Sequence, residues 1–296
     1  MFKKLAAVLA LALALTGCSE APKQWTAGDG PIKIVTSTNV WGSVASLVAG
    51  KHATVTAIIS NTNQDPHSYE ASARDQLLIE DADIVVMNGG GYDDFMEKLV
   101  EADDTPAILV NAYMASGDDE TRNEHIWYDV DQVGDVAAVI AGAVEAVDAS
   151  LFDEAFANVD VIRAELAKRK ATLDGMKSAG SCGKVFATEP LVDYLLEDAG
   201  CENVTPAAYS KAIEEERDVP PAVMEESLGL VKSGLSFIAY NSSVQSSQID
   251  ELLAAAPGVT PYGFSELLPQ DPDTFEYFGD YFMMLDNAIT MVGGKF

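Results

Sequence analysis

Short runs of β-branched and other apolar residues alternate with segments of helical periodicity along the first half of the chain. Four such runs predict strands, at residues 32–36, 55–59, 84–87 and 107–110. Between them, helical spacing occurs at residues 42–49, 73–81 and 92–102. This alternation is typical of parallel βα units. We therefore expect residues 31–150 to form an N-terminal α/β lobe, with a mostly parallel sheet flanked by helices.

A long helix is predicted in the middle of the chain. No proline interrupts residues 133–176, and apolar side chains recur there at steps of three and four residues or their sum. The recurring positions are Phe152, Phe156, Val159, Ile162, Leu166, Leu173 and Met176. The part from 153 to 177 would be about 35 Å long at the rise of an α-helix, which is long for a simple crossover. We expect residues 151–178 to form one helix that connects two lobes.

The βα pattern resumes after this helix. Strands are predicted at 184–188, 236–240 and 259–263, with a helix at 191–199. Adjacent prolines at 220 and 221 mark a turn before another helix near residue 222. Residues 179–296 are therefore expected to form a C-terminal α/β lobe, and the chain is long enough for two lobes of ordinary size.

The first residues have the organisation of an export signal. Lys3 and Lys4 precede an apolar stretch at 5–15 that is too short for a comfortable membrane span. The sequence Leu-Thr-Gly-Cys at 15–18 resembles a bacterial lipoprotein signal, which implies removal of residues 1–17 and diacylation of Cys18. A plain signal peptide with a chance cysteine is the alternative. Residues 18–30, rich in small and polar types, would tether the folded part to the outside of the cell membrane.

Charge and cysteine content agree with export. A formal net charge of −29 gives a surface that repels nucleic acid and anionic lipid headgroups, so no nucleic-acid partner is expected. With Cys18 assigned to lipid, Cys182 and Cys201 remain as an even pair in an oxidising compartment. A disulfide between them would close a loop of about 20 residues and stabilise the fold by about 3 kcal/mol. Two free buried thiols are the alternative, and the spacing disfavours a zinc site.

Two of the three histidines lie in short polar segments, 65–70 (Asp-Pro-His-Ser-Tyr-Glu) and 123–129 (Asn-Glu-His-Ile-Trp-Tyr-Asp). Imidazole is the commonest side-chain ligand of transition metals, which makes His67 and His125 candidate ligands. A neighbouring carboxylate could accept the second ring N–H of each and orient the ring. The candidates are Asp65 or Glu70 for His67, and Glu124 or Asp129 for His125. Ordinary surface histidines beside ordinary acids are the alternative.

Four candidate ligands follow predicted strands. His67 and His125 come after the second and fourth strands, and Glu189 and Glu266 come after the first and last strands of the second lobe. Open parallel sheets bind ligands outside the carboxyl ends of their strands, so we expect these four side chains to meet in one cleft between the lobes. Alternatively, Glu189 complements a helix dipole before a proline and Glu266 is an ordinary loop acid. His52 has no such placement, and we interpret it as a surface histidine.

Three segments resemble one known family. Residues 65–75, the Asn-Gly-Gly-Gly turn at 88–91 and residues 125–129 are similar to the zinc/manganese substrate-binding lipoproteins of ABC importers, the cluster A-I metal-binding family. The resemblance covers essentially the whole mature chain. It implies two α/β lobes joined by one long rigid helix, with Zn(II) or Mn(II) bound between them. It also implies that His67 and His125 are the first-lobe ligands, and that Glu189 and Glu266 occupy the second-lobe ligand positions.

The chain departs from this family in three places. Asn-Glu-His stands at 123–125 where members often have Asn-Pro-His, and Asp-Val at 129–130 where they often have Asp-Pro. Many zinc-specific members carry a histidine-rich loop before the second ligand, whereas residues 116–120 are acidic and contain no histidine. Two imidazoles with two carboxylates suit either ion, and the absence of a third histidine tilts the site towards Mn(II).

Together these observations predict an extracytoplasmic solute-binding lipoprotein that is a monomer and not an enzyme. It would capture Zn(II) or Mn(II) and deliver the ion to the transmembrane permease of an ABC importer. A metal-binding surface adhesin is the alternative, and a secreted zinc hydrolase is less favoured because the chain has no His-Glu-x-x-His pair. A serine hydrolase lacks its Gly-x-Ser-x-Gly elbow, and the glycines at 89–91 lack the spacing of a phosphate loop.

Overall fold

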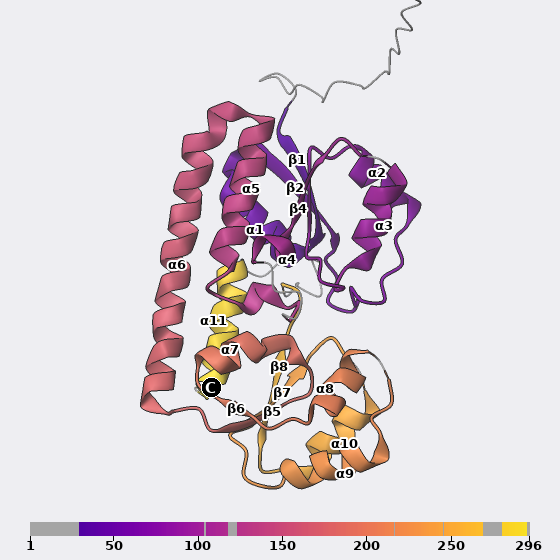
Figure 1. Ribbon diagram of the computed structural model, residues 1–296, viewed down its shortest axis with the longest axis vertical. Coiled ribbons are helices and arrows are strands. Elements are labelled where there is room, and N and C mark those ends of the chain that lie inside the picture. Colours follow the sequence, from indigo (N-terminus) through magenta and orange to yellow (C-terminus); the bar gives the residue numbers. More distant parts are fainter. Residues whose placement is uncertain are drawn as a thin grey trace, which may run out of the picture.

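The computed structural model describes residues 30–103, 105–117, 123–215, 217–244, 246–268 and 280–294. The predicted signal segment, Cys18 and nearly all of the predicted tether lie outside these residues. The described chain forms two lobes, each built on a four-stranded parallel sheet, and a long helix runs along one side of both (Figure 1). The predicted α/β class and two-lobe arrangement are confirmed.

The first lobe contains all four predicted strands. They are β1 (Ile32–Thr38), β2 (Ala53–Ile59), β3 (Ile84–Met87) and β4 (Ile108–Asn111), in the order β2-β1-β3-β4. Every residue of the inner strand β3 is buried, which explains its unbroken apolar sequence. The helices are α1 (Asn39–Ala49), α2 (Ala73–Glu80), α3 (Asp94–Asp103), α4 (Ala112–Ala115) and α5 (Val133–Val147). Because all neighbouring strands pair in parallel, the loops that follow them gather at one edge of the sheet.

The second lobe repeats this plan. Its strands are β5 (Lys184–Ala187), β6 (Glu202–Asn203), β7 (Phe237–Asn241) and β8 (Thr260–Phe264), in the order β6-β5-β7-β8. Its helices are α7 (Asp193–Asp198), α8 (Ala207–Glu214), α9 (Pro221–Leu230) and α10 (Ser247–Ala255). The sequence predicted three of these strands and missed β6, because two exposed residues carry no hydrophobic pattern.

The predicted connecting helix is α6 (Phe152–Ala179), 28 residues long. Its buried face consists of Ala155, Val159, Ile162, Leu166 and Leu173. Phe152, expected on this face, is 45% exposed and is the first residue of the helix. Although α6 is long, neither it nor any other helix in the described ranges is long and apolar enough to cross a membrane.

The connecting helix ends in a motif that fits its sequence. Gly180 has a φ of +56°, a left-handed conformation that glycine adopts without a steric penalty. Its N–H donates to the carbonyl of Lys177 (3.1 Å), and the N–H of Ser181 donates to the carbonyl of Met176 (3.1 Å). These two bonds satisfy carbonyls that would otherwise lack partners at the helix end.

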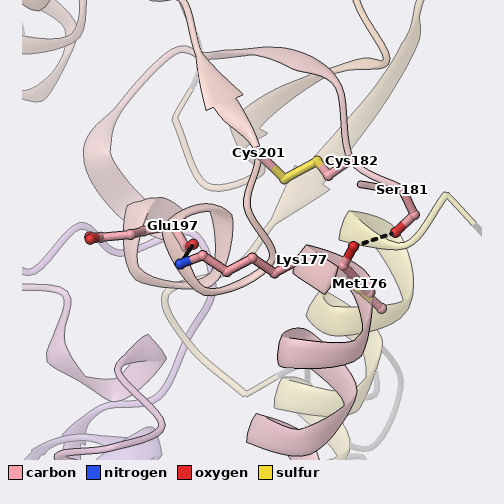
Figure 2. Close-up of a disulfide and its surroundings, with 6 residues drawn as sticks. All are labelled: Met176, Lys177, Ser181, Cys182, Glu197 and Cys201. Atoms are coloured by element: carbon pink, nitrogen blue, oxygen red, sulfur yellow. Dashed lines mark hydrogen bonds between the residues drawn. A yellow bond between two sulfur atoms is a disulfide. The ribbon is translucent and has the colours of Figure 1, made fainter. Parts of the chain in front are cut away.

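Cys182 and Cys201 form the predicted disulfide, with their Cα atoms 4.9 Å apart. Figure 2 shows that the bridge links the segment following α6 to the residue before β6. Nearby, Lys177 Nζ donates to the carbonyl of Glu197 (3.2 Å). The bridge and this bond fasten the end of the connecting helix to the second lobe.

The last helix, α11 (Tyr281–Val292), contacts both lobes, since it packs against α1, α6 and α7 (Figure 1). The Tyr281 N–H donates to Ser43 Oγ (3.0 Å), and its hydroxyl donates to the carbonyl of Trp127 (2.7 Å). The apolar core is also continuous between the lobes, because one buried cluster contains residues from both sheets.

Hydrogen bonds cross between the lobes beside this shared core. Asn39 donates from Nδ2 to the carbonyl of Leu268 (3.1 Å) and accepts at Oδ1 from the N–H of Leu268 (2.9 Å). The Tyr128 hydroxyl donates to the carbonyl of Ser265 (2.8 Å). The two lobes are therefore joined by the helix α6, by a common core and by direct polar contacts, an arrangement that resists wide hinge motion.

Candidate metal centre

The loops that follow the strands of the two sheets meet between the lobes. His67 lies in the loop after β2, His125 lies before a short helical turn that follows β4 and α4, and Glu266 comes two residues after β8. One potential ligand atom from each of these three side chains lies within 4.8 Å of the others. The structure thus brings together three of the four side chains that the sequence selected.

His125 is fully buried and its tautomer is set by Asn123. Asn123 Oδ1 accepts hydrogen bonds from the backbone N–H of His125 (2.9 Å) and from its ring Nδ1 (2.6 Å). Since a backbone N–H can only donate, this amide atom is the oxygen, and the ring proton resides on Nδ1. Nε2 consequently presents its lone pair and has no hydrogen-bond partner. It lies 3.5 Å from Glu214 Oε1 and 3.9 Å from Glu266 Oε1.

The sequence predicted that a carboxylate accepts the ring proton of His125, and this prediction was wrong. Neither Glu124 nor Asp129 accepts the ring proton; the neutral amide of Asn123 does. Burial, with a smaller effect of His67, lowers the pKa of His125 to about 3. The imidazole is therefore neutral at physiological pH, which is the form that coordinates metals.

His67 forms the more accessible side of the centre, with a side chain that is 23% exposed. Asp65 Oδ1 accepts from the backbone N–H of His67 (2.9 Å) and so shapes the turn rather than orienting the ring, contrary to expectation. The His67 Nε2 atom has no hydrogen-bond partner and lies 3.8 Å from Glu214 Oε1. Its ring contacts Tyr92 edge-on, with centroids 5.0 Å apart.

Glu214 is a site residue that the sequence argument missed. It is the last residue of α8, its side chain is only 14% exposed, and neither carboxylate oxygen has a hydrogen-bond donor. Burial raises the pKa of Glu214, and the nearby carboxylates of Glu124, Glu189 and Glu266 raise it further. The sequence signal was a run of three glutamates at 214–216, but neither spacing nor periodicity shows which of them points inward. The neighbouring Glu215 is 43% exposed and pairs with Arg217.

Glu189 is buried but does not join the group of ligand atoms. Asn241, at the end of β7, lies between Glu189 and Glu266: its Nδ2 donates to Glu189 Oε2 (3.0 Å) and to Glu266 Oε1 (2.9 Å). Burial is the main cause that raises the pKa of Glu189 to about 7 and that of Glu266 to about 8. Asn241 thus links Glu189 to Glu266, while Glu189 Oε1 is buried without a hydrogen-bond partner among the described residues.

The remaining histidine lies elsewhere, as expected. His52 Nε2 pairs with Glu154 Oε2 (3.0 Å) at the surface, next to the first turn of α6.

The chemistry of the centre suits a divalent cation. The Nε2 atoms of His67 and His125 and both carboxylate oxygens of Glu214 have no hydrogen-bond partner among the described residues. Glu266, which accepts from Asn241, lies in the same group of potential ligands. Buried carboxylates are costly unless they are paired, protonated or bound to a metal. A mixed nitrogen and oxygen donor set of this kind fits Zn(II) at low coordination number and Mn(II) when carboxylates bind through both oxygens.

A cleft of about 660 Å³ lies between the lobes. Residues of both lobes line it, including Asp65, Ser68, Ile213 and Arg217. Asp65 and Ile213 are close in sequence to His67 and Glu214, so the cleft lies beside the segments that carry these two residues.

Comparisons with known proteins agree with this geometry. The family profile described as "Zinc-uptake complex component A periplasmic" matches residues 34–293. The manganese-binding lipoprotein MntA of Halalkalibacterium halodurans is 31% identical over 138 residues, or 45% of each chain. The protein of the same name from Bacillus subtilis is 28% identical over 134 residues, or 43% of each chain. The aligned part thus spans less than half the length of these relatives.

Solved structures share the fold. The periplasmic zinc binding protein TroA of Treponema pallidum has a TM-score of 0.73 at 17% identity, covering 90% of this chain and 99% of that one. The AdcAII protein of Streptococcus pneumoniae has a TM-score of 0.76 at 20% identity, covering 90% and 100%. At these identities the likeness concerns the fold.

Stability of the metal-free protein should fall as the pH rises from 6.5 to 8. In the unfolded chain Glu266 titrates near 4.5, whereas burial raises its folded pKa to about 8. The native state therefore retains a proton that the unfolded state has lost, and each such carboxyl lowers the free energy of unfolding by about 1 kcal/mol per pH unit. This window avoids the opposing effect of His125, whose lowered folded pKa favours the native state only as the pH rises towards 6.5. Thermal unfolding in the presence of a chelator measures the slope, which Glu266→Gln should flatten; a slope of opposite sign in the wild type would contradict the assignment.

Replacing Asn123 with Ala should disturb the His125 ring without removing it. The Nδ1–H would lose its acceptor, and the ring proton would redistribute between the two nitrogens, which blocks Nε2 in part of the molecules. Loss of such an orienting partner typically weakens metal binding about 10- to 100-fold. Nitrogen-15 NMR of the imidazole in metal-free protein reports the tautomer, and chelator competition reports affinity. Asn123→Asp, which keeps an oxygen acceptor, is the matched control and should retain the Nδ1–H tautomer; an unchanged tautomer in the Ala variant would refute the role.

Proposed function

The chain belongs to the zinc-uptake complex component A family, and we propose that it captures a divalent transition-metal ion outside the cytoplasm. The ion, Zn(II) or Mn(II), would then be delivered to the transmembrane permease of an ABC importer. One observation carries this proposal: the Nε2 atoms of His67 and His125 and the carboxylate of Glu214 have no hydrogen-bond partner among the described residues, and Glu266 lies 3.9 Å from His125 Nε2.

The proposed ligands are His67, His125, Glu214 and Glu266. Three of them are the residues that the sequence selected, and Glu214 replaces Glu189 because it lies 3.5 Å from His125 Nε2 and 3.8 Å from His67 Nε2. Glu189 acts behind this set, through the amide of Asn241 that it shares with Glu266. In this position its charge adds to the negative potential around the ion without direct coordination.

Carboxylate-rich coordination supports Mn(II) as cargo, since oxygen ligands suit this ion and allow six donors. Zn(II) nevertheless binds most mixed nitrogen and oxygen sites more tightly than Mn(II), by the Irving–Williams order. Supply outside the cell, as well as affinity, would therefore determine which ion is carried. Two relatives are named for manganese and one structural neighbour for zinc, in line with a site type that accepts both.

Transport accounts for the site better than hydrolysis does. A catalytic zinc keeps an open position for a reacting water, with three protein ligands. Here four protein side chains converge, and two of them, His125 and Glu266, are almost completely buried. Such enclosure favours tight holding of an ion over turnover of a substrate. The adhesin alternative concerns surfaces rather than this centre, and no feature of the site favours it.

We propose the same division of the chain as the sequence suggested: a signal at 1–17, a tether at 18–30, lobes at 31–150 and 179–296, and the connecting helix at 151–178. The first two segments lie outside the described residues. Support for a lipid anchor on Cys18 comes from the signal-like sequence and from the relatives named lipoproteins. The anchor would hold the protein, as a monomer, close to the permease at the outer face of the cell membrane.

Mass spectrometry of the natively produced protein tests the anchor. The expected N-terminal residue is Cys18, carrying a diacylglycerol group on its sulfur. Substitution of Cys18 by Ser should release the protein from the membrane fraction without affecting metal binding by the folded part. Recovery of an intact segment 1–17, or of an unlipidated mature N-terminus, would refute the anchoring proposal.

The purified folded part should bind one Zn(II) or Mn(II) per chain. An ion that binds only the folded state, at about 100 times its dissociation constant, stabilises by about 2.7 kcal/mol, which corresponds to a melting shift of about 5 to 10 °C. His67→Ala should abolish most of this shift. Elemental analysis and thermal unfolding with each ion are the measurements.

Glu214→Gln and Glu189→Gln form a matched pair for the ligand assignment, since each replaces one buried carboxyl group by an amide of the same shape. Glu214→Gln should weaken binding strongly, and Glu189→Gln should weaken it much less. His52→Ala is the surface control and should leave binding unchanged. The reverse order of the two glutamine variants would restore Glu189 as the ligand, and absence of metal after incubation with both ions would overturn the transport proposal.

A further inference from the structure

A second group of potential ligands overlaps the first. One ligand atom each from His67, Glu124 and Glu214 lies within 4.8 Å of the others, just as for His67, His125 and Glu266. His67 belongs to both groups. Glu214 also connects them, because its Oε1 lies 3.5 Å from the unpartnered, fully buried Nε2 of His125.

The two groups differ in their distance from solvent. In the inner group, His125 is completely buried and Glu266 is 4% exposed. In the outer group, the side chains of His67 and Glu214 are 23% and 14% exposed, and Glu124 is partly buried. An ion arriving through the cleft therefore meets the outer group before the inner one.

Hydrogen bonds to its carbonyl hold the backbone of Glu124 in place. Asn88, a buried residue directly after β3, donates from Nδ2 to the carbonyl of Glu124 (3.0 Å). The N–H of Ile126 donates to the same carbonyl (2.7 Å). The Asn88 side chain is in turn anchored, since its Oδ1 accepts from Trp41 Nε1 (3.0 Å). A rigid backbone thus presents the Glu124 side chain towards His67 and Glu214.

The position of Glu124 in the sequence brings its carboxylate close to the proposed ligands. Glu124 occupies the middle of Asn-Glu-His at 123–125, directly before the buried His125. The outer group therefore adds an oxygen donor to the four side chains already proposed as ligands.

We propose that His67, Glu124 and Glu214 form an outer divalent-cation position through which the ion enters and leaves the buried centre. This inference rests on the proposed function, since it describes a step in the capture of the same ion. An imidazole and two carboxylates bind a partly hydrated ion that keeps waters on its cleft side. The ion then exchanges the remaining waters and Glu124 for His125 and Glu266, while His67 and Glu214 stay bound. Stepwise exchange avoids stripping the hydration shell in one event.

The outer position predicts that Glu124 affects the rates of metal association and dissociation. Glu124→Gln should slow both association and dissociation of Mn(II) and of Zn(II) about tenfold, within the range by which local charge affects encounter rates. The dissociation constant should change by less than about threefold, because the inner ligands are intact. Stopped-flow tryptophan fluorescence can follow both rates, since the Trp127 ring lies 5.2 Å from that of His125.

A matched control separates a ligand from a general charge effect. Glu70→Gln removes the same charge from an exposed acid three residues after His67, outside both groups. It should leave the rates nearly unchanged, and the effect of Glu124→Gln should persist at high salt. Rates unaffected by Glu124→Gln, or equally affected by Glu70→Gln, would overturn the outer position. A large loss of affinity with unchanged association would also overturn it, because Glu124 would then be a ligand of the final site.

Equilibrium metal binding by variants that lack one inner ligand gives a second test of the outer position. With His125→Ala, weak binding of one Mn(II) should remain, and adding Glu124→Gln should remove it. Glu266→Gln, which preserves side-chain shape, is a second background should the alanine variant fold poorly. Residual binding that does not depend on Glu124 in either background would refute the outer position alone. Failure of the wild type to bind any metal would instead refute the proposed function.

Discussion

The arrangement of this protein depends on holding several buried carboxylates close together without a cation from the protein itself. Glu189, Glu214 and Glu266 are all largely buried near His67 and His125. Burial and mutual repulsion raise the pKa values of the three acids in the metal-free state. Such a cluster is unfavourable for folding. A divalent ion reduces the repulsion, because it displaces the protons and its positive charge pairs with the carboxylates. The metal-free protein is therefore less stable than it would be without these acids, and the same acids favour metal binding.

The rest of the fold resists the separation that this repulsion would cause. The 28-residue helix α6 contacts both lobes, α11 packs across them, and one apolar core extends through both. The disulfide at 182–201 fastens the second lobe to the end of α6. With so many fixed connections, capture and release of an ion depend on local movement of ligand-bearing loops more than on a wide opening of the cleft. The exposure of His67 marks the loop after β2 as the accessible side.

Neutral amides orient the ligands of this site. Asn123 holds the Nδ1–H of His125, Asn241 holds the carboxylates of Glu189 and Glu266, and Asn88 holds the backbone of Glu124. Carboxylates often play this role behind metal-binding histidines. In a centre that already contains several acids, another carboxylate would add repulsion, whereas an amide fixes geometry without charge. Asn123 also ties the lobes together, since its Nδ2 donates to the carbonyl of Pro190 (2.5 Å).

Local patterns in the sequence determined the alternation of strands and helices, the long connecting helix and the positions of His67, His125 and Glu266 at strand ends. These features depend on hydrophobic period and on the rule that parallel strands direct their following loops to one edge. Only the tertiary structure brings Glu214, at the end of α8, close to His67 and His125, and connects Glu189 to Glu266 through the amide of Asn241. The same holds for Asn123 in place of Glu124 behind His125, for the two-residue strand β6 and for α11 across both lobes. Distances between separately folded segments are set by the docking of the two lobes, and no local period in the chain encodes that docking.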